Sequence, residues 1–157
     1  MEYTRESNTG AALVTREPVG VVAAIVPWNA PILTSVLKLA PALLAGCTMV
    51  LKPSPEPPLD AYLLGEMLQS AGLPGGVVNI VVADREVSEY LVRHPSVDKV
   101  SFTGATGAGR RIASLCGQDL RRVTLELGGT SAAVLLDDAD LDMARSRGLP
   151  RGSQRSY

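Results

Sequence analysis

The sequence predicts an incomplete, doubly wound parallel α/β sheet. Short apolar runs alternate with longer segments of helical character over most of the 157 residues. This alternation is typical of parallel βαβ units with right-handed crossovers. The hydrophobic content of 46% is enough for a core, and the aromatic content is only 4%. A core of Ala, Val, Leu and Ile suits close packing of helices on a sheet, and the length fits one domain.

Apolar runs and the turn signals between them define the expected elements. The expected strands are 18–26, 48–52, 77–82, 99–102, 123–127 and 132–136. The expected helices are 31–45, 60–71, 84–93 and 105–115.

The first strand is centred on the uninterrupted apolar run 21–26, which Pro27 ends. The helix that follows has apolar residues on all sides, as a buried helix does, and Gly46 ends it. Pro41 inside this helix predicts a kink or one missing hydrogen bond. The next strand, 48–52, ends in a lysine that a proline follows.

The second half of the chain repeats this pattern. Residues 60–71 carry apolar positions at helical spacing, and the Gly- and Pro-rich run 72–76 ends the helix. A His-Pro pair closes the helix over 84–93. A glycine-rich segment, 104–109, follows a strand and opens the last expected helix.

The two ends of the chain do not share the pattern. Residues 1–17 show no clear period and are expected to be an N-terminal extension. The tail, 143–157, is rich in Arg, Ser and Gly without an apolar period, and we expect it to be disordered.

Charge and composition indicate which kinds of binding partner, cellular location and metal site to expect. A net charge of −1 gives no reason to expect nucleic acid, and no apolar run is long enough to predict a membrane span. Cys47 and Cys116, in a chain without a signal peptide, predict a reducing compartment and a cytoplasmic location. His94 has no second histidine or cysteine nearby, so no metal site is expected.

The segment 124–129 places Glu126 in an apolar run just before two glycines. The apolar neighbours predict a strand that is buried on both faces, where a carboxylate is costly unless it is paired or functional. Glu126 is therefore a candidate general base. The alternative, which this segment alone favours, is a glutamate at a strand edge that is salt-bridged to Arg121 or Arg122.

Two strand ends carry further candidates. Asn29 follows the first strand, where its amide could donate to an oxyanion or could simply cap the helix that begins near Pro31. Lys52 ends the second strand, where a lysine suits ribose hydroxyls or phosphate, although a solvated surface lysine is the commoner case.

The glycine-rich segment 104–109 could hold a phosphate with its backbone N–H groups, helped by the helix dipole. It is not the G-x-G-x-x-G fingerprint, and a purely structural turn explains it equally well. Cys116 invites interpretation as a nucleophile, but a core thiol near a helix end is the favoured interpretation.

Four motifs in this order resemble the aldehyde dehydrogenase superfamily. They are Pro27-Trp28-Asn29, Lys52-Pro53-Ser54, Phe102-Thr103-Gly104 followed by Gly109-Arg110, and Leu125-Glu126-Leu127-Gly128-Gly129. The resemblance runs from about Arg16 to Asp142 and covers about a third of a full-length member. It implies a Rossmann-like dinucleotide-binding domain, NAD or NADP as cofactor, and oxidation of an aldehyde to a carboxylic acid.

The resemblance also implies roles for individual residues. Asn29 resembles the oxyanion-stabilising amide and Glu126 the base that activates the deacylating water. Lys38 matches a further lysine close to the active site. The residues that resemble cofactor ligands are Trp28, Lys52, Ser54, Gly104, Gly109 and Leu127, with Lys52 at the adenosine ribose and the two glycines at the turn and helix start under the pyrophosphate.

Two positions depart from the family pattern. Pro55 stands where many members carry a glutamate that binds the ribose hydroxyls, and the adjacent Glu56 is expected to point elsewhere. The choice between NAD and NADP therefore stays open. Thr130 replaces the lysine that usually follows the two glycines.

By the same resemblance, 18–130 is a partial dinucleotide-binding domain and 131–142 the start of a catalytic domain. The family nucleophile lies downstream of the glutamate, which places it just past Tyr157, so the isolated chain is expected to be inactive. The tail suggests a shifted reading frame or a truncated gene. The alternative function is a non-catalytic nucleotide-binding remnant. Full-length relatives are expected to be homo-oligomers that act on aldehydes, and this chain is not expected to assemble properly.

Overall fold

The computed structural model describes residues 2–15, 17–56 and 58–129, together with positions 136, 138, 140, 142 and 143. The strands are β1 (Glu2–Ser7), β2 (Gly10–Thr15), β3 (Val21–Ile25), β4 (Thr48–Lys52), β5 (Val78–Ile80), β6 (Lys99–Gly104) and β7 (Arg122–Leu127). The helices are α1 (Pro31–Leu44), α2 (Pro58–Ser70), α3 (Arg85–Arg93) and α4 (Thr106–Gln118). Each element predicted between residues 18 and 127 is present, with its ends moved by a few residues at most.

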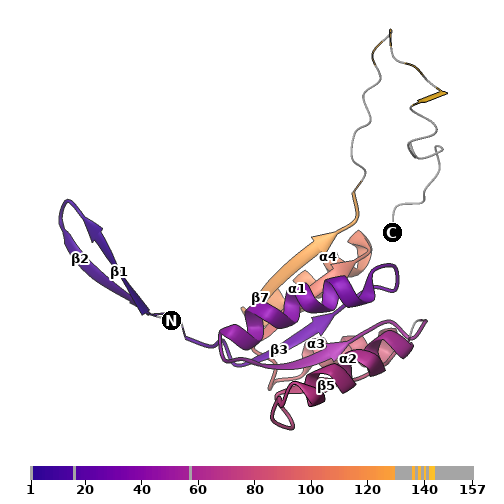
Figure 1. The fold of residues 1–157 in the computed structure, drawn as a ribbon, viewed down its shortest axis with the longest axis horizontal. Coiled ribbons are helices and arrows are strands. Elements are labelled where there is room, and N and C mark those ends of the chain that lie inside the picture. The colour runs from indigo at the N-terminus through magenta and orange to yellow at the C-terminus, as the bar shows by residue number, and fades with distance from the viewer. Residues whose placement is uncertain are drawn as a thin grey trace.

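A five-stranded parallel sheet forms the body of the molecule, in the order β5-β4-β3-β6-β7. The chain moves outward from β3 through β4 to β5, then returns to the other side of β3 for β6 and β7 (Figure 1). The predicted doubly wound α/β fold is thereby confirmed. β3 is the central strand, and its register pairs Ile25 with Lys52 on one side and with Phe102 on the other.

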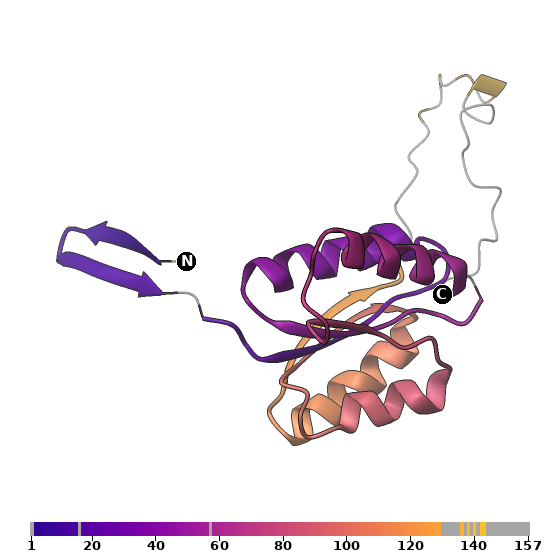
Figure 2. The same ribbon diagram turned by 60° about the horizontal axis from the view of Figure 1, so that its bottom comes forward.

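Two helical layers cover the sheet, as Figure 2 shows, with α1 and α2 on one face and α3 and α4 on the other. Alternate residues of β3 therefore enter two separate cores. Ala23 and Ile25 pack with Ile112 and Leu115 on the face of α3 and α4. Val22, Ala24 and Val26 pack in the core on the face of α1 and α2. This two-sided burial explains the uninterrupted apolar run in the sequence.

The amino ends of β3 and β6 are held by Asp98. Its carboxylate accepts a hydrogen bond from the Val21 N–H at 2.8 Å, and its own N–H donates to the Val21 carbonyl at 3.0 Å. Gly20 lies directly beside this carboxylate, with a φ of 106°, and a Cβ there would come within 2.1 Å of Asp98 Oδ2. Only glycine suits that position, both for the backbone and for the space.

An antiparallel hairpin of β1 and β2 precedes the sheet and lies apart from it in Figures 1 and 2. Sequence analysis expected an N-terminal extension without regular elements here. The signal that could have identified the hairpin is the turn Asn8-Thr9-Gly10, which has Tyr3 and Val14 as cross-strand partners on either side.

Two expectations about burial are wrong in this chain. β7 was expected to be buried on both faces, but five of its six residues are exposed and its one sheet neighbour among the described strands is β6. α1 was expected to be buried all round, but Leu33, Leu37 and Leu44 are 62%, 65% and 90% exposed. Apolar residues show that a surface can be covered, and they do not show that this chain covers it.

Other expectations lie at least partly outside the described residues. These are the strand 132–136, the catalytic-domain segment 131–142 and the tail 143–157. Within the described part of the chain, no helix is both long and apolar enough to cross a membrane.

Candidate functional site

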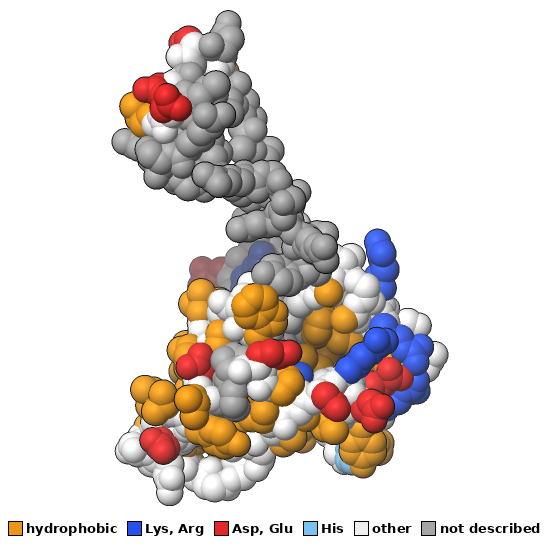
Figure 3. All heavy atoms as spheres, turned by 90° about the vertical axis from the view of Figure 1, so that its right-hand side faces the viewer, with side chains coloured by type: hydrophobic (Ala, Val, Ile, Leu, Met, Phe, Trp, Pro, Cys, Tyr) orange, Lys and Arg blue, Asp and Glu red, His pale blue; other side chains and the backbone are white. Residues whose placement is uncertain are grey.

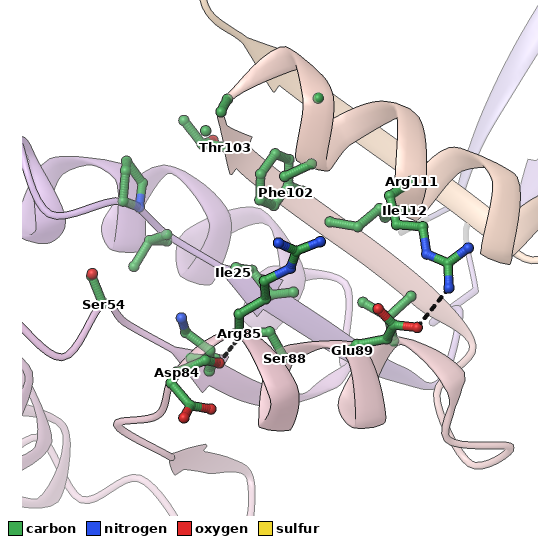
Figure 4. A pocket seen from close by; sticks show the side chains of 18 of the residues that line it. Ile25, Ser54, Asp84, Arg85, Ser88, Glu89, Phe102, Thr103, Arg111 and Ile112 are labelled. Carbon is green, nitrogen blue, oxygen red and sulfur yellow. Dashed lines mark hydrogen bonds and ion pairs between the residues drawn. The ribbon is translucent and has the colours of Figure 1, made fainter. Parts of the chain in front are cut away.

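A cavity of about 760 Å³ opens at the carboxyl ends of β3, β4 and β6, on the face that α3 and α4 cover. The strand order reverses at this point, because β4 and β5 lie on one side of β3 and β6 and β7 on the other, and ligands bind at such a point in open α/β folds. Ile25 and Phe102 form the floor, as Figure 4 shows, with Ser54 and Asp84 toward one end and Arg111 at the other.

Lys52 is the charged residue of the cavity that is most firmly built into the sheet. It ends β4, it is 7% exposed, and its carbonyl accepts a hydrogen bond from the Val26 N–H at 3.1 Å. Burial lowers the pKa of its ammonium group, while the Glu56 and Asp84 carboxylates act in the opposite direction. The alternative of a solvated surface lysine is therefore wrong.

The segment after Lys52 lines the same cavity. Ser54, Pro55 and Glu56 all contribute to the lining, and the Ser54 hydroxyl donates to the Glu56 carboxylate. The expectation that Glu56 points elsewhere is wrong. The two prolines at 53 and 55 keep this segment extended, and the Ser54 hydroxyl bonds to the carboxylate two residues later.

The start of α4 forms the opposite wall. Gly104 ends β6, and a Cβ there would lie 2.7 Å from the Phe102 ring. α4 begins at Thr106 after Ala105, and Gly107 and Ala108 face the cavity. A helix start this close to glycines leaves backbone N–H groups free to approach an anion.

Gly109 does not mark the helix start, which is a correction to the sequence analysis. It is buried within α4, and a Cβ there would lie 2.4 Å from the Leu127 side chain. Its lack of a side chain lets α4 pack closely on β7. Gly109 is not among the residues that line the cavity, so its contribution to a phosphate site would be indirect.

The third wall is α3, which sequence reasoning did not connect to the site. Asp84 caps this helix by accepting hydrogen bonds from the Glu86 and Val87 N–H groups at 3.1 and 3.3 Å. Arg85 follows it into the cavity lining. The aspartate immediately before an amphipathic helix is a recognisable N-cap signal, but nothing in the sequence shows that the cap faces Lys52.

An ion-pair group closes the far end of the cavity between α3 and α4. The Glu89 carboxylate accepts from Arg93 at 3.0 Å, which is an i,i+4 pair, and from Arg111 at 2.8 Å (Figure 4). The hydrogen bonds from Arg111 and Arg93 lower the pKa of Glu89. Figure 3 shows charged side chains of both signs gathered on one side of the molecule, beside a broad apolar area.

The other sheet face carries a second polar group. Lys38 of α1 donates to the Ser101 hydroxyl of β6 at 3.0 Å. Burial lowers the pKa of Lys38, and the Glu126 carboxylate acts against this shift. Glu126 lies beside Thr103 in the register of β6 and β7. The cavity and the group of Lys38, Ser101 and Glu126 are therefore separated by the sheet itself.

The alternative for Asn29 is wrong, and the alternative for Glu126 is confirmed only in part, because Glu126 is exposed on the edge strand β7 but no salt bridge joins it to Arg121 or Arg122. The cap residue of α1 is Ala30 with no side-chain cap hydrogen bond, so Asn29 is not the N-cap. Arg121 binds the Val92 carbonyl and lies 3.4 Å from the Asp119 carboxylate, and Arg122 is at the opposite end of β7 from Glu126. Neither Asn29, Trp28, Glu126 nor Leu127 is in the lining of the cavity.

Both cysteines are buried and unbonded. Burial raises the pKa of the Cys116 thiol, which is the opposite of what a reactive thiolate requires. Its core position agrees with the interpretation as a structural thiol. Within the described residues there is also no group of three His, Cys, Asp or Glu side chains that could hold a metal ion.

Comparison with known proteins places this chain in a family. The model of the aldehyde dehydrogenase family matches residues 2–151. Geranial dehydrogenase of Castellaniella defragrans is 58% identical over 153 residues, and 3-succinoylsemialdehyde-pyridine dehydrogenase of a Pseudomonas species is 48% identical over 149 residues. These alignments cover 97% and 94% of this chain but 32% and 31% of the relatives, so the chain spans about a third of their length.

Solved structures show the same likeness. The NAD+ complex of a Mycobacterium tuberculosis aldehyde dehydrogenase superposes with a TM-score of 0.83 at 48% identity, over 91% of this chain and 30% of that one. The NAD+ complex of a Bacillus cereus aldehyde dehydrogenase gives 0.82 at 40%, over 93% and 30%. The family match begins before Arg16 and extends past Asp142, so it is longer at both ends than the sequence motifs indicated. The chain belongs to the aldehyde dehydrogenase family.

Proposed function

We propose that this chain forms the dinucleotide-binding part of an NAD(P)-dependent aldehyde dehydrogenase that oxidises an aldehyde to a carboxylic acid. The observation that carries the proposal is the cavity itself. Lys52 and Ser54, from the end of β4, face Gly104 and the start of α4 across one space. Hydroxyl and ammonium groups on one side and a glycine-opened helix start on the other suit the ribose and the phosphates of a dinucleotide.

The two faces of the sheet would then have separate functions, one in binding the cofactor and the other in the reaction. When bound, the nicotinamide dinucleotide supplies the hydride acceptor. Lys52 and Ser54 would hold its ribose on the face of α3 and α4. Glu126 near the carboxyl end of β7 and Asn29 in the segment after β3 would then act at the reactive end of the cofactor.

Asn29 and Glu126 are proposed to assist the reaction at the aldehyde group. The Asn29 amide would stabilise the oxyanion, a contribution of about 2.7–4 kcal/mol for one such donor. Glu126 would take a proton from the water that releases the acid. Glu126 lies close enough to Lys38 to oppose the lowering of the Lys38 pKa by burial.

Lys52→Ala tests the binding site. Calorimetry with NAD and NADP on the wild-type chain should detect binding, and the variant should bind about ten- to a hundredfold more weakly because a charged hydrogen-bond donor is lost. Lys99→Ala is the matched control, since Lys99 begins β6 at the opposite end of the sheet. Equal affinity of the wild type and Lys52→Ala would show that the cofactor binds elsewhere.

No cysteine follows Glu126 in the sequence. We therefore propose that the chain on its own binds the cofactor without turnover, as a non-catalytic nucleotide-binding module would. An assay of reduced cofactor with a panel of aldehydes should show none. Turnover that disappears in Cys116→Ser would identify Cys116 as a nucleophile and contradict this proposal.

A further inference from the structure

β7 has an open edge. It is the last strand in the order β5-β4-β3-β6-β7 (Figure 1), and β6 is its one neighbour among the strands that the structure describes. In a strand with one neighbour, every second backbone N–H and C=O group points away from the sheet. Five of the six residues of β7 are also exposed. β7 can therefore accept a further strand through backbone hydrogen bonds.

The two faces of β7 carry different side chains, because residues alternate between the faces of a strand. The apolar residues are on the face of α3 and α4, since Leu125 packs against the core there. Arg122, Thr124 and Glu126 are on the face of α1 and α2. Neither Arg122 nor Glu126 forms an ion pair with another described residue. The edge therefore presents a positive charge, a hydroxyl group and a negative charge in a row.

From this arrangement we infer that β7 pairs with the β7 of a second copy of this chain, antiparallel and centred on Thr124. The two five-stranded sheets then form one sheet of ten strands. In this register Arg122 of each copy lies opposite Glu126 of the other, Thr124 lies opposite Thr124, and Val123 lies opposite Leu125. Opposite charges, paired threonines and paired apolar residues all stabilise neighbouring antiparallel strands. The inference does not depend on the proposed cofactor binding.

Other registers and occupants lose this match. A pair centred on Val123 leaves Glu126 without a partner within β7, and a pair centred on Leu125 does the same to Arg122. A parallel pair in register places each charge beside the same charge. An unrelated extended peptide could form the backbone hydrogen bonds, but a two-fold pair of identical strands also matches both charges. Sequence analysis did not predict this pair, because the sequence does not show that β7 lies at an edge.

Reversal of the two charges tests the inference. Sedimentation velocity over a range of concentrations should show a reversible dimer of the wild-type chain. Arg122→Glu places two carboxylates opposite each other, and Glu126→Arg places two guanidinium groups opposite each other. Each variant alone should self-associate about tenfold more weakly, because two opposite-charge pairs in the dimer become two like-charge pairs. An equimolar mixture of the two variants should associate as the wild type does, since opposite charges face each other again.

The matched controls change the same charges away from the edge. Arg5→Glu in the hairpin and Glu66→Arg on α2 alter exposed residues. Both controls should dimerise as the wild type does.

A cysteine at the centre of the pair gives a readout that does not depend on charge. Opposite Cα atoms in antiparallel strands are about 4.5–5.5 Å apart, which suits a disulfide. Thr124→Cys should therefore form a covalent dimer under mild oxidation, whereas Glu66→Cys should not. The native Cys47 and Cys116 are buried, so the wild type is the baseline for this reaction.

Four results would overturn the inference. A wild-type chain that is monomeric at every concentration does not pair. A dimer that is unchanged in Arg122→Glu, with circular dichroism showing a folded variant, uses another surface. Single variants that stay monomeric when mixed exclude the charge match, and failure of Thr124→Cys to crosslink excludes the register.

Discussion

The centre of the parallel sheet and its β7 edge differ in composition and in how much of the chain covers them: β3 is entirely apolar, whereas β7 alternates polar and apolar residues. Residues 22–25 of β3 are all buried and have paired strands on both sides. β7 pairs only with β6 among the described strands, and five of its six residues are exposed. The cavity with Lys52 and Gly104 belongs to the supported region, whereas Glu126 lies on the edge. The chain's own core therefore positions the proposed cofactor ligands better than it positions the proposed base.

The largest expected contrast is in stability. Leu51→Ala should lower the free energy of unfolding by about 2–5 kcal/mol, because Leu51 is 0% exposed and its removal leaves a cavity. The same change at Leu127, which is 39% exposed, should lower it by about 1 kcal/mol or less.

Urea unfolding followed by circular dichroism measures both values. Equal losses would contradict the comparison, because they would mean that the edge strand is packed as firmly as the centre.

Replacing the glycines of β6 and α4 by alanine should give differences of intermediate size in the free energy of unfolding. Gly104→Ala should lower the free energy of unfolding by about 1–3 kcal/mol, because its Cβ would meet the buried Phe102 ring and its φ is 159°. Gly109→Ala should be close to neutral, because a methyl group of the half-exposed Leu127 can move aside and alanine favours the helix by about 1 kcal/mol.

Gly107→Ala is the control for helix propensity, since nothing lies within 4 Å of a Cβ at that position. Thermal melts of the three variants should rank Gly107→Ala as the most stable and Gly104→Ala as the least. A Gly109→Ala variant as unstable as Gly104→Ala would show that the Leu127 side chain on β7 cannot move aside for the added methyl group.

The smallest effect on stability is expected at Lys38, whose pKa is influenced by Glu126 on the edge strand. The folded-state pKa of Lys38 is lowered from 10.5 by burial. Between that lowered pKa and 10.5 the unfolded chain binds more protons, so the contribution of Lys38 makes stability rise with pH. Lys38→Met lacks this contribution.

The wild type should therefore gain stability relative to Lys38→Met as the pH is raised toward 10.5, and subtraction of the two removes the other titrating groups. Urea unfolding at a series of alkaline pH values measures the difference. A slope of the opposite sign would mean that attraction to Glu126 exceeds the effect of burial, and hence that the edge holds Glu126 more firmly than its exposure indicates.

The sequence predicted the positions of the strands and helices well, but it predicted poorly which of their faces are buried. Apolar periods and turn signals placed every strand and helix from β3 to β7, because these patterns are local. The exposure of Leu33 and Leu37 on α1, and of most of β7, could not be predicted, since the same residues would serve whether or not another surface covered them. The hairpin was missed because neither strand alternates apolar and polar residues, and five of the six residues of β2 are exposed.

For the site, the motifs correctly predicted which strand ends form it. They did not predict which side chains line the same cavity. Lys52, Ser54 and Gly104 were expected and do line one cavity. Asp84 and Arg85 come from a helix with no motif of its own. The direction of Glu56 follows from the path of the chain through Pro53 and Pro55, and only the three-dimensional arrangement shows it.

The strand order also has a consequence for folding kinetics. The hydrogen bond from Val21 to Asp98 joins residues 77 positions apart, and among the paired strands β3 and β6 have the largest separation along the chain. The elements α1, β4, α2, β5 and α3 all lie between these two strands in the sequence, and such non-local contacts form slowly. The cavity lies at the carboxyl ends of these two strands. The ability to bind a ligand should therefore appear late in refolding, together with the pairing of β3 and β6, after the local βαβ unit of β3, α1 and β4 has formed.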